Sequence, residues 1–124
     1  MATTQHDLVI PASPASVAEA RRFIATVLVV LGAVSVTDVA GLLVSELVTN
    51  AVVHAGWTIR VLVSGADGIV RVGVQDSSRR PPTPRQASGG DGNGRGLAMV
   101  SDLAMRWGVD VIRDGKEVWF ELRS

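Results

Sequence analysis

Apolar residues recur every three or four positions through the first half of the chain, a spacing that predicts helices. One helix is expected over residues 13–31, because it opens with a serine that can cap the helix and a proline that suits the first helical position. A second is expected to begin at Ser35 or Thr37 and to run to about Ala55. A short strand over residues 6–10 is expected to precede both helices.

The second half instead alternates apolar and polar residues over short runs, which predicts strands. Strands are expected over 57–64, 69–75, 106–112 and 117–122, with a short helix over 97–104. Ala-Asp-Gly between the first two strands is a hairpin signal, whereas the 18 residues from 77 to 94 have no apolar period and form a long loop of the kind that binds ligands. This order predicts an α+β fold, a two-layer sandwich with helices on one face of a mostly antiparallel, mixed sheet.

Length and composition fit one globular domain spanning residues 1–124. Hydrophobic residues make up 47% of the chain and the formal net charge is zero, so a nucleic-acid or membrane-surface partner is not indicated. The most apolar stretch, 23–36, has 14 residues and is short of the roughly 20 that span a bilayer. No secretory signal pattern and no cysteine are present, so a soluble cytoplasmic protein is expected.

The second predicted helix carries a line of polar residues beside its apolar face. The apolar face comprises Ala40, Val44, Leu47, Val48, Ala51 and Val52, and three more apolar residues, Leu42, Leu43 and Val53, are expected close to the polar line. Glu46, Asn50 and His54 stand four residues apart, so they share a strip about 80° wide. Asn50 offers an oxygen to Mg²⁺ and amide hydrogens to phosphate, and Glu46 can accept a proton from a hydroxyl. A solvated polar edge explains the same spacing, and His54 alone can be a helix-end residue bonded to a carbonyl.

Two later segments offer further ligand contacts. Asp76 ends a predicted buried strand, where its carboxylate can accept a hydrogen bond from an adenine amino group or simply begin a turn. Gly92, Gly94 and Gly96 precede a predicted helix, and their free amides with Arg95 suit phosphate, although a flexible linker has the same composition. No Walker loop is present, because the glycines are not followed by Lys-Ser or Lys-Thr.

Taken in order, these motifs resemble the Bergerat ATP-binding fold shared by gyrase, heat-shock chaperone and histidine-kinase ATPase domains. Within that group the chain is most similar to the short actinobacterial anti-sigma-factor serine/threonine kinases, on the segments Glu46-Leu-Val-Thr-Asn-Ala-Val-Val-His54, Gly94-Arg-Gly-Leu97 and 107–122. The resemblance implies that Glu46 is the general base and that Asn50 binds Mg²⁺. It further implies that the ATP contacts comprise Asn50, His54, Asp76, Gly92, Gly94, Arg95, Gly96 and Leu97.

The resemblance also implies a reaction and partners. The reaction would be phosphoryl transfer from ATP to a serine or threonine of a STAS-type anti-anti-sigma factor, by a homodimer that also binds a sigma factor. Two departures favour an alternative, a regulatory module that binds ATP weakly or not at all and acts by sequestering a partner. The usual glycines after Asp76 are replaced by Ser-Ser-Arg-Arg, and Lys116 stands where relatives often carry threonine. A histidine-kinase fragment and a self-standing ATPase fit less well, because the domains that those proteins need are missing from this chain.

Overall fold

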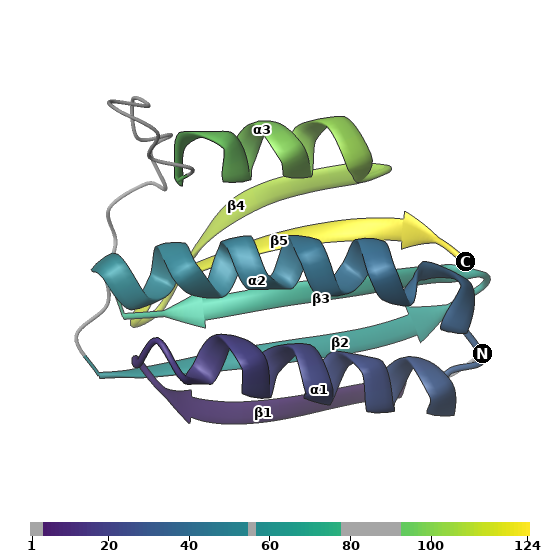
Figure 1. Ribbon diagram of the computed structural model, residues 1–124, viewed down its shortest axis with the longest axis horizontal. Coiled ribbons are helices and arrows are strands. Elements are labelled where there is room, and N and C mark those ends of the chain that lie inside the picture. Colours follow the sequence, from purple (N-terminus) through teal and green to yellow (C-terminus); the bar gives the residue numbers. More distant parts are fainter. Residues whose placement is uncertain (1–3, 55–56, 78–92) are drawn as a thin grey trace.

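The structure is a computed structural model that describes residues 4–54, 57–77 and 93–124. Its centre is a five-stranded sheet in the order β1-β2-β3-β5-β4 (Figure 1). The strands are β1 (Thr4–Pro11), β2 (Thr58–Ala66), β3 (Ile69–Asp76), β4 (Arg106–Ile112) and β5 (Gly115–Arg123). All four pairings between these strands are antiparallel. The expected antiparallel sheet is therefore confirmed, and the described strands contain no parallel pair that would make it mixed.

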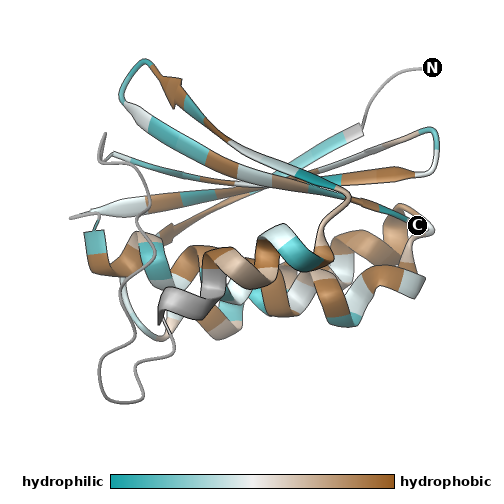
Figure 2. Ribbon diagram, turned by 90° about the horizontal axis from the view of Figure 1, so that it is seen from above, coloured by the Kyte–Doolittle hydropathy of each residue, from teal (hydrophilic) through white to brown (hydrophobic). Residues whose placement is uncertain are grey.

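Three α-helices lie on one side of the sheet, and the elements that the structure describes leave its other side uncovered (Figure 2). They are α1 (Ser16–Val30), α2 (Thr37–His54) and α3 (Asn93–Leu103), with a 3₁₀ turn, η1 (Val34–Val36), leading into α2. The helices pack on alternate strand residues, such as Val70, Val72 and Val74 of β3, all of which are buried. This arrangement confirms the predicted two-layer α+β sandwich.

The uncovered face of the sheet carries a charged network in place of a second layer. Arg71 lies within 3.7 Å of the carboxylates of Asp110 and Glu117 and within 3.6 Å of that of Glu121. Its guanidinium also stacks 4.0 Å from the centre of the Trp119 ring. Polar groups that satisfy one another in this way let a sheet face remain in contact with water.

One predicted helix start and one predicted turn can be compared with the structure. The first helix begins at Ser16 rather than Ser13, because residues 13–15 form a turn in which the Ser13 carbonyl accepts from the Ser16 N–H at 2.9 Å. The Ser16 hydroxyl then donates to the Pro11 carbonyl at 2.7 Å, and no side chain caps α1. The predicted hairpin turn is confirmed: Asp67 and Gly68 have φ of 54° and 78°, as a tight turn between twisted strands requires.

The helix that carries the polar strip, α2, packs against β2 and β3. Leu43, which stands one helical turn before Glu46 beside the polar strip, is fully buried in the core, whereas its neighbour Leu42 is 37% exposed. Residues Val34–His54 are long and apolar enough to cross a membrane by length and composition, but 50% of that window is buried inside the domain. Core helices of globular domains have the same apolar character, so this helix is weak evidence for a membrane span.

Candidate functional site

Four chain segments that are distant in sequence meet at one end of the domain. α2 ends there at His54, β3 ends there at Asp76, and β5 begins beside Asp76, because Lys116 is its direct partner in the β3–β5 register. α3 also begins at this end and packs against α2 (left of Figure 1). The segments that carry the predicted ligand contacts are therefore neighbours in space.

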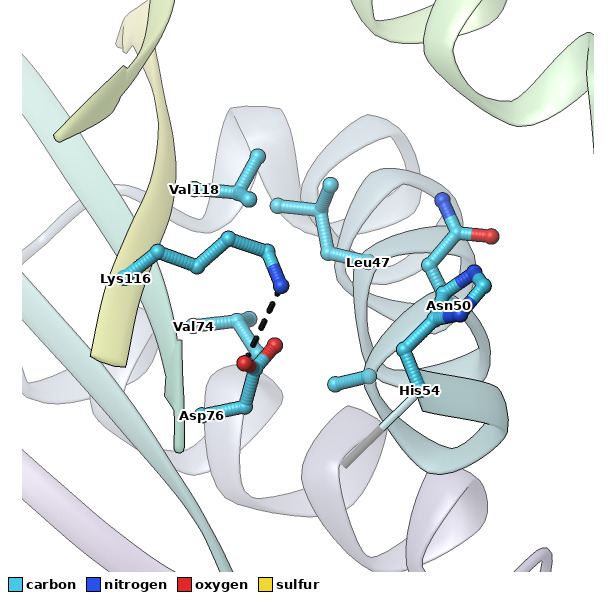
Figure 3. A pocket seen from close by; sticks show the side chains of 8 residues that line it. Leu47, Asn50, His54, Val74, Asp76, Lys116 and Val118 are labelled. Carbon is cyan, nitrogen blue, oxygen red and sulfur yellow. Dashed lines mark hydrogen bonds and ion pairs between the residues drawn. The ribbon is translucent and has the colours of Figure 1, made fainter. Parts of the chain in front are cut away.

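A small cavity lies between α2 and the sheet at this end (Figure 3). It is lined by Leu47, Asn50, Ala51 and His54 from α2, Val74 and Asp76 from β3, and Lys116 and Val118 from β5. The structure therefore brings together Asn50, His54 and Asp76, which were predicted from separate motifs. Glu46 is half-buried one helical turn before Asn50, and it is not among the residues that line this cavity.

Asp76 is buried because it continues the inward-facing row of β3. Val70, Val72 and Val74 point towards the helices, and the next residue in that alternation is the aspartate. Its side chain is 3% exposed. A carboxylate at such a position needs a hydrogen-bonding or charged partner, since burial without one is costly.

Lys116 supplies a partner for this carboxylate. Its Nζ lies 3.0 Å from Asp76 Oδ1, and the lysine side chain is 5% exposed. In Figure 3 the lysine chain extends from β5 across the space above Asp76, and its ammonium lies between Asp76 and Leu47. The strands approach closely here: a Cβ on Gly115 would lie only 1.8 Å from the Asp76 carbonyl oxygen, so only a residue without a Cβ fits. The cation is thus held on the carboxylate by direct strand pairing.

Asn50 and His54 lie beside each other on α2, one turn apart (Figure 3). Leu47 lies on the side of the helix nearer the ion pair, and Asn50 and His54 point away from it. Both polar side chains are half-buried, so they remain open to a ligand that approaches from the rim of the cavity. The carboxylate and the amide of the pocket are therefore separated by apolar side chains.

The helix that was expected to follow the glycines begins earlier in the chain and includes two of them. α3 begins at Asn93, so Gly94, Arg95 and Gly96 form its first turn instead of preceding it. Leu97 is 5% exposed and packs in the hydrophobic core. Gly92 and most of the predicted ligand-binding loop over residues 77–94 lie outside the described residues. The phosphate-binding role of this segment and of Leu97 stays a prediction.

At the rim of the pocket, the Asn50 amide suits Mg²⁺ that is bound together with the phosphates of ATP. Among the described residues, no group of three or more His, Cys, Asp and Glu side chains could hold a metal ion. Mg²⁺ is often bound by one or two protein oxygens together with substrate phosphates, and the Asn50 amide oxygen suits that mode.

The inner part of the pocket is too small for a purine base in this conformation. The cavity measures about 10 Å³, which holds about one water molecule, whereas small-molecule pockets usually measure about 300–1,000 Å³. The Lys116 side chain fills the space in front of Asp76. A base that bonds to Asp76 would need this side chain to move.

Sequence reasoning noted Lys116 as a departure but did not identify its ion pair. The pair follows from the β3–β5 register, which places Asp76 opposite Lys116, and the sequence pattern left the strand order open. One signal was available: Lys116 is the only lysine in a chain with twelve lysine and arginine residues in all. A lone ammonium at a strand start points to a specific partner more than to general surface charge.

Comparison with known proteins places the chain in a family. Residues 10–122 match the model of the histidine kinase-like ATPase domain, which covers all the described elements of the pocket. The chain is also 38% identical over 80 residues to an uncharacterized protein of Streptomyces coelicolor, an alignment that covers 60% of this chain and 75% of the relative. The chain therefore belongs to the histidine kinase-like ATPase domain family, a membership that indicates an ATP-binding regulatory function.

Proposed function

We propose that this protein is an ATP-binding anti-sigma regulator with serine/threonine kinase activity, which phosphorylates a STAS-type anti-anti-sigma factor and sequesters a sigma factor. The observation that supports it best is that Asn50, His54 and Asp76 line the same pocket. These residues come from two motifs that the anti-sigma kinases also carry in this order. We further propose a cytoplasmic homodimer, on the same resemblance.

Each residue has a distinct part in this proposal. Asp76 accepts a hydrogen bond from the adenine amino group, and Asn50 holds Mg²⁺ through its amide oxygen. Glu46, one turn before Asn50 on α2, accepts the proton of the attacking serine or threonine hydroxyl. Bound ATP with Mg²⁺ supplies the phosphoryl group and the cation that neutralises its charge. The protein contributes position and proton acceptance.

The test is phosphoryl transfer to candidate partners. STAS-domain proteins from the same genome are purified and incubated one at a time with this protein, Mg²⁺ and ATP labelled at the γ-phosphate. The proposal expects label on the serine or threonine of one partner, and loss of that label by about 10²-fold or more with Glu46→Ala, as removal of a general base produces. Asp38→Ala, at the other end of α2, is the matched acidic control and is expected to retain activity.

The ion pair of Asp76 with Lys116 favours a second candidate, a regulatory module that acts by sequestration without catalysis. The acceptor proposed for adenine is already engaged by an ammonium at 3.0 Å. This module would be favoured by a partner that binds tightly to the protein both with and without ATP and receives no label when labelled ATP is present. The same result would contradict the kinase.

A further inference from the structure

The ammonium of Lys116 occupies the position that a ligand donor would take on Asp76. A buried carboxylate oxygen that accepts from an amino group of a base needs that donor at hydrogen-bond distance, about 2.7–3.2 Å. The lysine Nζ stands at 3.0 Å from Oδ1. The lysine and an amino-bearing base therefore offer the same kind of group to the same carboxylate.

The space in front of the carboxylate leads to the same conclusion. With the lysine in place, the cavity between Leu47, Val74 and Val118 measures about 10 Å³. These three apolar side chains of α2 and the sheet form part of its wall, and such a surface suits the faces of a planar base. The flexible four-carbon stem of lysine allows the ammonium to leave for solvent while its backbone stays in β5. The pocket can thus enlarge without unpairing the strands.

We propose that Lys116 is a built-in competitor for the nucleotide base at Asp76, so that a purine carrying a 6-amino group binds only by displacing the lysine. This inference rests on the proposed nucleotide-binding function. Lys116 would then lower the affinity for the nucleotide. A cation near a polyanionic ligand is generally expected to raise that affinity. Removal of the lysine should therefore tighten binding, although it removes an attractive charge.

The first test measures ADP with Mg²⁺ by titration calorimetry, which avoids turnover. Lys116→Ala is expected to bind at least tenfold more tightly than the wild type. The matched control is Arg60→Ala, which removes a cation from an exposed ion pair with Asp7 at the opposite face of the sheet and should leave affinity within about twofold. Unchanged or weaker binding by Lys116→Ala, with measurable binding by the wild type, would overturn the competition while leaving the proposed function intact. Absence of binding in both proteins would overturn both.

The second test needs no substitution and covers the case in which Lys116→Ala does not fold. Because Lys116 is the only lysine, an amine-reactive reagent reports on its exposure without interference from other side chains. At 5% exposure it should react slowly in the free protein, and saturating ADP with Mg²⁺ should raise its rate at least fivefold, measured on its peptide by mass spectrometry. The N-terminal amine is the internal reference. A rate that stays level or falls on nucleotide binding would show that the lysine remains on Asp76, and the competition would be rejected.

Discussion

Lys116 and Asp76 face each other across β3 and β5 and form an ion pair with 5% and 3% of their side chains exposed. Attraction between such charges is offset by the cost of removing both from water, so the pair as a whole adds little stability. Loss of one partner is different, because the remaining buried charge then loses this close contact while it stays largely out of water. The pair therefore ties the stability of the free protein to the same groups that we assign to ligand binding.

Single and double substitutions separate these effects. Lys116→Met and Asp76→Leu are each expected to lower the free energy of unfolding by about 3–5 kcal/mol, and the double substitution should recover most of that loss. Urea unfolding at neutral pH measures all three. If the double variant is as unstable as the sum of the single ones, the two side chains are not coupled. Arg60→Met, which breaks an exposed pair, should cost less than about 1 kcal/mol.

The orientation of α2 can be tested with two adjacent leucines. Leu43 is fully buried and Leu42 is 37% exposed. Leu43→Ala is expected to lower the free energy of unfolding by about 2–5 kcal/mol, because it leaves a cavity in the core, and Leu42→Ala should cost less than half as much. Chemical denaturation of the two variants gives the comparison directly. Equal losses would mean that α2 is rotated about its axis relative to the structure.

Two glycines should respond to alanine in opposite directions. A Cβ at Gly115 would overlap the Asp76 carbonyl oxygen at 1.8 Å, so Gly115→Ala should cost at least about 1–3 kcal/mol as the strands are forced apart. A Cβ at Gly41, inside α2, would meet only the Arg21 side chain at 3.8 Å, an ordinary contact. Gly41→Ala should therefore stabilise the protein by about 0.5–1 kcal/mol, through helix propensity. Thermal unfolding of both variants distinguishes the signs, and a harmless Gly115→Ala would refute the close approach of the strands.

Hydrophobic spacing was sufficient to predict the elements and the α+β class, because helix and strand periods are properties of neighbouring residues. It misplaced the start of α1 at Ser13, since the structure uses that residue in a turn, held in part by a contact of Ser16 with Pro11. It also left Leu43 out of the apolar face of α2, which is wider in the structure because the helix packs against both the sheet and the neighbouring helices. Local pattern does not carry that tertiary information.

The site was predicted in part for the same reason. Asn50 and His54 share a strip because they lie on one helix, and motif order linked them to Asp76 across the 21 residues of chain between His54 and Asp76. The contact of Asp76 with Lys116 depends on which strand lies beside β3, and β5 reaches that place only after 38 further residues of chain between Asp76 and its first residue, Gly115. No local pattern specifies such a pairing. The structure was needed to see that the predicted base acceptor is already paired.

The most direct test of the nucleotide pocket is titration calorimetry of ATP with Mg²⁺ into the wild type, Asn50→Ala and Asp38→Ala. The account predicts binding by the wild type, an affinity at least tenfold lower for Asn50→Ala, and unchanged binding for Asp38→Ala, whose side chain is exposed at the far end of α2. Equal affinities for all three proteins, or no heat of binding in the wild type, would contradict it.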